Sequence, residues 1–125
     1  MMRKIAMSVG ALSLSVVGLV AFGPAAQADN GACPANSFCL FQHDNYEGGR
    51  AVFTSTTKHL GDHKFNNGVT VGDNASSMIN NMSHRVALYQ DGDCSGEQYN
   101  AAKESSDRDF SNNGFDNKAS CLVVI

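Results

Sequence analysis

Short apolar runs separated by polar residues dominate the chain after residue 28. These runs are rich in β-branched and aromatic side chains, which favour strands. They are residues 38–41, 51–53, 78–79, 85–89 and 121–125. Clusters of Gly, Asn, Asp and Ser lie between them and are typical of turns. No segment here keeps a helical period for three turns, and only residues 99–104 indicate a single helical turn. The pattern predicts an almost entirely β protein.

The first 28 residues follow a different pattern. Two basic residues precede an apolar stretch over residues 5–22, and small residues follow up to Ala28. This layout is typical of a secretory signal peptide. A retained membrane anchor is the alternative, because the stretch is nearly long enough to span a bilayer, but its Ser and Gly residues favour cleavage. We therefore expect a signal peptide over residues 1–28 and a secreted, extracellular domain over residues 29–125.

Composition narrows the function. The 125 residues include nine Lys and Arg against twelve Asp and Glu, a net charge of −3. Every acidic residue lies after the leader, so the exported domain has a more negative net charge than the whole chain. An acidic chain without a basic cluster is a poor binder of nucleic acid or anionic membranes. Its length suits one domain with a modest core. We expect a soluble monomer.

The four cysteines, Cys33, Cys39, Cys94 and Cys121, all lie after the leader. An even number in a small exported domain predicts two disulfides, with three possible connectivities. The short loop between Cys33 and Cys39 contains Pro and Asn and favours a local bridge. That bridge leaves Cys94 with Cys121. A zinc site is the weaker alternative, because neither a CxxC nor a paired Cys/His spacing is present.

Two patterns each occur twice, in the same order. The pattern aromatic-x4-large-x-Gly covers residues 41–48 and 89–96, here called hairpins one and two. The pattern apolar-x-Asx-x-Ala-Ser-(Ser/Cys)-apolar covers residues 71–78 and 115–122, here called arches one and two. The hairpin Gly supplies a positive φ, and the Asx and Ser side chains of an arch bond to the nearby backbone.

The doubled patterns predict two tandem units, repeat one over about residues 37–82 and repeat two over about residues 84–125. Each unit has the elements of a four-stranded Greek key. Two such units packed face to face would form a β-sandwich of about eight strands.

These motifs resemble the βγ-crystallin family. Its signature pairs an aromatic-x4-aromatic-x-Gly hairpin with an Asx-Asx-x-x-(Ser/Thr)-Ser arch in each Greek key. Phe41, Tyr46 and Gly48 match the hairpin completely, and residues 116–121 match the arch except at the last position. The resemblance implies an all-β, disulfide-stapled sandwich of two tandem Greek-key motifs. Residues 33–41 also resemble a secreted bacterial branch grouped with the actinomycete-type metalloproteinase inhibitors, a peptidase-inhibitor family.

Repeat two departs from the signature at two positions. Cys94 stands where hairpin two would carry its second aromatic, and Cys121 stands where arch two would end in Ser. A disulfide between them would replace the ring packing. The departures therefore support the Cys94–Cys121 pairing a second time.

The resemblance also implies two calcium sites, each built from one arch and one hairpin, because Ca²⁺ prefers oxygen ligands. One site would use Asn117, the Lys118 carbonyl, Ser120 and the Glu47 carbonyl. The other would use Asp73, the Asn74 carbonyl, Ser76 and the Ser95 carbonyl. Gly72 occupies the first Asx position of arch one, which weakens the second site. The alternative is that the Asx and Ser side chains only cap the arches, so calcium is not required.

Inhibition of an extracellular peptidase, specifically a metalloendopeptidase, is the function that the resemblance implies. The candidate exposed loops are residues 54–68 and 101–114. The second cysteine pair is long-range, so the resemblance assigns no reactive bond. The alternative function is a calcium-binding structural or stress module without a protease target.

Catalysis is the weakest reading of the sequence. His59 and His63 have an HxxxH spacing, but Gly61 disfavours the helix on which that spacing places two ligands together. The sequence contains no nucleophile-elbow motif, and both predicted disulfides consume their thiols. We therefore expect a binding protein and not an enzyme.

Overall fold

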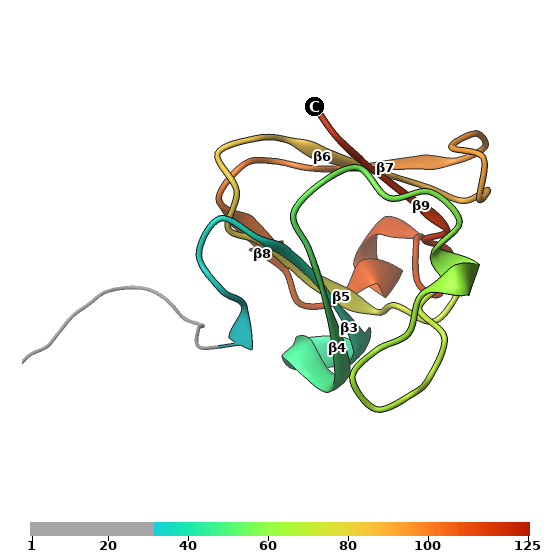
Figure 1. Cartoon of the computed structure of the whole chain (residues 1–125), viewed down its shortest axis with the longest axis horizontal. Helices are drawn as coiled ribbons and strands as arrows, with labels where there is room; N and C mark the ends of the chain where they lie inside the picture. Colours follow the sequence, from blue (N-terminus) through green and yellow to red (C-terminus); the bar gives the residue numbers. More distant parts are fainter. Residues whose placement is uncertain (1–31) are drawn as a thin grey trace, which may run out of the picture. The chain divides into compact units, whose positions relative to one another are not determined.

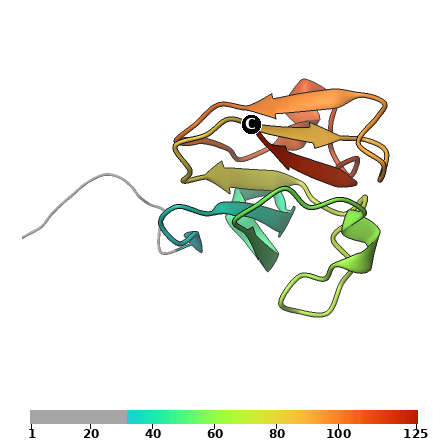
Figure 2. The same cartoon turned by 45° about the horizontal axis from the view of Figure 1, so that its top comes forward.

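The computed structural model describes residues 32–125, and the predicted signal peptide lies outside this range. The described residues form two antiparallel sheets joined by loops and short 3-10 helices (Figures 1 and 2). No helix among them is long and apolar enough to cross a membrane. The all-β sandwich predicted from the sequence is confirmed.

The strands coincide with the apolar runs and include two that the runs do not mark. The strands are β3 (Phe38–His43), β4 (Glu47–Phe53), β5 (Ser77–Asn80), β6 (Val86–Tyr89), β7 (Gln98–Ala101), β8 (Ser105–Asp107) and β9 (Cys121–Val124). The 3-10 helices are η3 (Asp44–Tyr46), η4 (Leu60–Asp62) and η5 (Phe110–Asn113). The helical turn predicted over residues 99–104 is wrong. That stretch begins in β7, where pairing with β6 overrides the weak local preference.

The two sheets exchange strands between the repeats. One sheet has the order β4-β3-β5-β8, so β8 of repeat two pairs with β5 of repeat one. The other sheet has the order β7-β6-β9, and Thr57 of repeat one forms an antiparallel bridge with Leu122 of β9. The sequence predicts two separate units packed together, whereas in the structure each sheet is completed by the other repeat.

The core lies between the sheets. Phe38 and Leu40 of β3 face it from one sheet, and Leu88 and Leu122 face it from the other, all fully buried. Tyr99 packs its ring against the buried rings of the 110–115 segment, with centroid separations of 4.9 and 5.5 Å. This aromatic cluster supplies much of the apolar contact, because large rings bury the most area.

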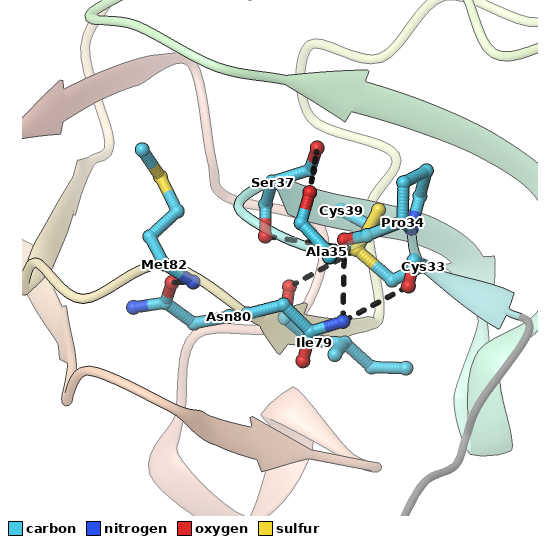
Figure 3. Close-up of a disulfide and its surroundings, with 9 residues drawn as sticks. Cys33, Pro34, Ala35, Ser37, Cys39, Ile79, Asn80 and Met82 are labelled. Atoms are coloured by element: carbon cyan, nitrogen blue, oxygen red, sulfur yellow. Dashed lines mark hydrogen bonds between the residues drawn. A yellow bond between two sulfur atoms is a disulfide. The ribbon is translucent and has the colours of Figure 1, made fainter.

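A disulfide between Cys33 and Cys39 ties the start of the domain to β3 (Figure 3), and Asn81 bonds the same stretch to the end of β5. Asn81 donates from Nδ2 to the Cys33 carbonyl at 2.9 Å, and its backbone N donates to the Ser37 carbonyl at 2.9 Å. The second disulfide joins Cys94 to Cys121. Both pairings are those that the sequence favours.

Candidate functional site

The two arches lie side by side and are joined by matching backbone bonds. Asp73 N donates to the Ala119 carbonyl at 3.0 Å. Asn117 N donates to the Ala75 carbonyl at the same distance. Asp73 and Asn117 both adopt the left-handed conformation, with φ of 61° and 59°, which Asp and Asn tolerate better than most residues. The two arches are therefore related by a local twofold symmetry.

Each arch is also fixed to the hairpin of its own repeat. Ser76 N donates to the Phe41 carbonyl, and Ser120 N donates to the Tyr89 carbonyl, both at 2.8 Å. The acceptors are the first aromatic residues of the two hairpin motifs. This arrangement brings the polar side chains of both arches next to the hairpin loops.

The side-chain oxygens of the arches pair across the twofold axis. The Ser120 hydroxyl donates to Asp73 Oδ1 at 2.8 Å. The Ser76 hydroxyl lies 3.5 Å from Asn117 Oδ1. The sequence grouped Ser120 with Asn117 and Ser76 with Asp73, each within one arch. In the structure each serine instead contacts the Asx of the other arch, because the strand exchange sets the arches against each other.

The last residue of each arch closes its hairpin in a different way. Ser77 is buried, accepts from Tyr46 N at 3.1 Å, and donates to the His43 carbonyl at 2.7 Å. Cys121 at the equivalent position of arch two is bonded to Cys94. In hairpin one the Phe41 and Tyr46 rings are also packed edge to face at 5.7 Å. The disulfide thus takes over both the ring contact and the serine bonds.

Three carboxylates lie near one another beside hairpin one, and none of them is a predicted ligand. The pKa of the Asp44 carboxyl is raised by partial loss of hydration and by the nearby carboxylates of Asp109 and Asp116. Asp116 Oδ1 is buried without a hydrogen-bond partner. Asn117 and Ser76 supply further oxygens at this position. This donor set fits a hard cation, which would satisfy the unpaired oxygen and offset the repulsion.

Asp44 and Asp109 are absent from the predicted ligand sets. Asp44 lies in the variable part of the hairpin motif, and Asp109 caps η5 by accepting from Ser111 N at 3.0 Å. Neither a variable position of a motif nor a position outside the motifs carries a sequence signal for a ligand. Only the fold brings these carboxylates near Asp116.

The site beside hairpin two is more fully bonded. The Ser95 carbonyl accepts from Asp91 N at 3.0 Å, and Asp73 Oδ1 accepts from the Ser120 hydroxyl. The Asn74 side chain donates to the Thr70 carbonyl at 2.9 Å. This set offers fewer free oxygens, so it fits a cation less well than the first site does.

The structure explains why Gly72 occupies the first Asx position of arch one. A Cβ at Gly72 would lie only 2.7 Å from the backbone N of Gly61. The close approach of η4 therefore requires Gly there and removes a carboxylate or amide from this site.

Among the predicted ligand groups of the two sites, only the Asp73 side chain carries a formal charge. Lys118 Nζ forms an exposed ion pair with Glu97 at 3.0 Å. No three His, Cys, Asp or Glu side chains within residues 32–125 gather closely enough to hold a metal ion by themselves. A cation would depend on the carbonyls of Glu47 and Lys118 together with hydroxyl and amide oxygens.

The two histidines of the HxxxH motif contact different neighbours. His59 adopts a left-handed conformation, and its backbone N donates to the Gly92 carbonyl at 3.1 Å. The His63 ring packs edge to face on Phe53 with centroids 6.2 Å apart. Between them the chain forms the single 3-10 turn η4, and not the α-helix on which an HxxxH pair shares one face.

Comparisons with known proteins agree with this geometry. A model of the peptidase inhibitor family I36 matches residues 26–101, more than half of the chain. No curated protein matches the chain.

Solved structures of βγ-crystallin domains match the fold. A structure described under the evolution of the eye lens βγ-crystallin domain fold has a TM-score of 0.67 at 17% identity, covering 74% of this chain and 89% of that one. An archaeal βγ-crystallin has a TM-score of 0.59 at 20% identity, covering 74% and 100%. A domain from Flavobacterium johnsoniae has a TM-score of 0.58 at 23% identity, covering 70% and 92%. At these identities the likeness concerns the fold.

Proposed function

The chain belongs to the peptidase inhibitor family I36, and from this membership we propose that it is a secreted inhibitor of an extracellular metallopeptidase. An inhibitor family member is a binding protein and not an enzyme. The family match over residues 26–101 is the observation that carries the proposal. The leader-like start of the sequence and the two disulfides support export to an oxidising compartment.

The scaffold has the physical properties that an inhibitor needs. Disulfides fix the start of the domain and hairpin two, and the strand exchange binds both sheets together. A rigid binding loop loses little conformational entropy in a complex, so it binds tightly and leaves slowly. A peptidase would hold such a loop without releasing cleaved product.

The test is inhibition by the oxidised, leader-free protein. Titration into a thermolysin-like metallopeptidase and into a subtilisin-like serine peptidase should give stoichiometric loss of activity against the metallopeptidase alone. The same protein with both disulfides reduced is the control, and it should inhibit weakly because its loops are no longer fixed. Full metallopeptidase activity with the oxidised protein present would refute the proposal.

Calcium binding beside hairpin one is a second candidate function. The unpaired Asp116 oxygen and the raised pKa of Asp44 favour it. Asn117, Ser76 and the carbonyls of Glu47 and Lys118 would hold the ion, which would neutralise the local carboxylates. Calcium would stabilise the fold there and would take no part in peptidase binding.

Thermal unfolding with calcium and with chelator tests this second function. Excess calcium should raise Tm by several degrees, because a ligand that binds only the folded state stabilises it. Asn117→Ala should abolish that shift, whereas Asn112→Ala, at an exposed position in η5, should keep it. An unchanged Tm in the parent protein would exclude the site.

A further inference from the structure

Residues 54–59, here called the crossing segment, carry the chain from β4 to η4. In Figure 2 this segment is the green tube that leaves β4 and reaches the short helix beside β9. Buried Phe53 precedes it and buried Leu60 follows it. Thr57 is half-buried, and all other residues of the segment are exposed. The crossing segment is therefore a surface segment anchored in the core at both ends, with bends at residues 54 and 55 and a bridge to β9 at Thr57.

The centre of the crossing segment is braced by β9. Thr57 N donates to the Leu122 carbonyl at 2.8 Å, and Leu122 N donates to the Thr57 carbonyl at 2.9 Å. The Thr56 hydroxyl accepts from Val124 N at 3.0 Å. Beyond the brace, His59 N is bonded to the Gly92 carbonyl. Cutting one peptide bond here would leave both new ends held in place.

The antiparallel pairing leaves the other side of the segment open. When one residue of a strand exchanges both backbone bonds with its partner, its two neighbours direct their N–H and C=O groups to the opposite side. The backbone N–H and C=O of Thr57 both bond to β9, so the backbone N–H and C=O groups of Thr56 and Lys58 point outward. No backbone bond from either residue to another described residue is found. This open edge can accept an extended peptide chain.

The other exposed loops contain tight turns, whereas a peptidase cleft binds extended backbone. The loop of hairpin two contains Cys94 and Gly96 at φ of 69° and 84°. The loop after Phe65 turns at Gly68, with φ of 89°, and is bonded back to β4 through Asn66. Residues 101–114 contain Glu104 at φ of 51° and the 3-10 helix η5. Within the crossing segment, the bends fall at residues 54 and 55 and positive φ occurs only at His59, so residues 56–58 contain neither.

We infer that the crossing segment is the part of this protein that enters the peptidase cleft, pairing through the outward backbone of Thr56 and Lys58, with the Lys58 side chain in a subsite. The inference rests on the proposed inhibitory function. Peptidases bind their substrates as extended strands, and residues 56–58 present a short stretch already fixed on β9 through the bridge at Thr57. Lys58 is the one long charged side chain in it and is exposed. Of the candidate loop over residues 54–68, the inference thus selects the first six residues as the part that contacts the peptidase.

Charge reversal at Lys58 tests the inference. Lys58→Glu should raise the inhibition constant about tenfold or more, as expected for a central interface residue. Lys64→Glu, an equally exposed charge reversal outside the segment, should change it less than about threefold. Equal thermal unfolding of both variants verifies that the fold is intact. Equal inhibition by both would overturn this inference and leave the inhibitory function standing.

Amide hydrogen exchange gives a second readout that does not depend on the side chain. The Thr57 amide should be protected in the free protein, while the Thr56 and Lys58 amides exchange quickly. Binding to the peptidase should protect the latter two, because they would bond to the cleft. Protection confined to hairpin two or to residues 64–70 would place the contact elsewhere and overturn the inference. If the parent protein inhibits no peptidase, the inhibitory function itself fails.

Discussion

Asn80 shows how one buried polar residue can hold several segments. Its side chain is fully buried, and its Nδ2 donates to the carbonyls of His84 and Ala102, each at 3.0 Å. Its Oδ1 accepts from Met82 N at 2.9 Å. The residue thus joins the link between the repeats to the end of β7. A fully satisfied amide of this kind fixes a loop because no alternative arrangement satisfies all its partners.

Replacing this amide should be strongly destabilising. Asn80→Leu leaves buried backbone groups without partners, so we expect a loss of about 2–4 kcal/mol in the free energy of unfolding. Urea denaturation followed by circular dichroism measures it. Asn112→Leu, at an exposed position, serves as the control and should stay within about 0.5 kcal/mol of the parent. Similar losses in the two variants would show that the bonds of Asn80 carry little stability.

Asp44 gives the molecule a pH-dependent contact. Its folded pKa is raised above the ordinary value of 3.8, so folding is favoured by its protonated form. The favourable contribution is complete below pH 3.8 and is lost as pH rises through the folded pKa. At neutral pH the ionised carboxylate is repelled by Asp109 and Asp116.

Asp44→Asn should therefore raise Tm at pH 7 in the absence of divalent cations, and should leave Tm nearly unchanged at pH 3. Melting curves of parent and variant at both pH values, with chelator present, test the sign. Glu47→Gln, at an exposed position in the same hairpin, removes a different carboxylate and controls for the general loss of negative charge. A lower Tm for Asp44→Asn at pH 7 would contradict the repulsion.

At the scale of elements, the two hairpins have the same backbone form and different closures. Tyr46 and Cys94 adopt matching positive φ values of 61° and 69°, and Gly48 and Gly96 have 78° and 84°. Hairpin one is closed by the hydrogen bonds of Ser77, and hairpin two by the disulfide to Cys121. The covalent closure restricts the unfolded chain, whereas the hydrogen bonds act only in the folded state.

Removing the long-range disulfide should cost more than removing the local one. In the chain-entropy model, Cys94→Ala with Cys121→Ala loses about 3–4 kcal/mol, and Cys33→Ala with Cys39→Ala about 2 kcal/mol, because the first closes a longer loop. Urea denaturation of the two double variants measures the difference. A larger loss from the pair at the start of the domain would show that local contacts, such as those of Asn81, outweigh loop closure.

The element-level features were predictable to different degrees. The hairpins and arches were visible because they need special residues, such as Gly48 for its positive φ. Strand β8 has the polar sequence Ser-Ser-Asp, so no apolar alternation marks it. Thr57 pairs with β9 as a single bridge, and a single residue has no periodicity. Ser76 and Ser120 each contact the other arch because of those two pairings. The sequence pattern predicts neither pairing, so it could not predict these contacts either.

At the scale of the whole molecule, the exchanged strands make the two sheets one cooperative unit. Met78 of β5 is buried in the shared core and is paired with Asp107 of β8. Tyr99 of β7 in the other sheet donates a hydrogen bond to the same Asp107 at 2.6 Å. Loss of either sheet would thus remove partners from the other, which is the condition for two-state unfolding.

Met78→Ala should destabilise both sheets to the same extent, by about 2–5 kcal/mol through the cavity that it leaves. Amide signals of Leu40 in β3 and Leu88 in β6, followed through a urea series, should share one lowered midpoint. Val52→Ala, at a 42% exposed position, should leave that midpoint nearly unchanged. Separate midpoints for the two amides would show that the sheets unfold independently.

The strand exchange also bears on how such a protein can arise. A single ancestral repeat would have one strand without a sheet to complete, and a second identical copy would supply the missing pairing in return. Two copies of a short chain could thus have formed the sandwich before any gene carried both. Duplication and fusion would then free the copies to diverge, and the disulfide of Cys94 and Cys121 at the positions equivalent to Tyr46 and Ser77 is a difference of that kind.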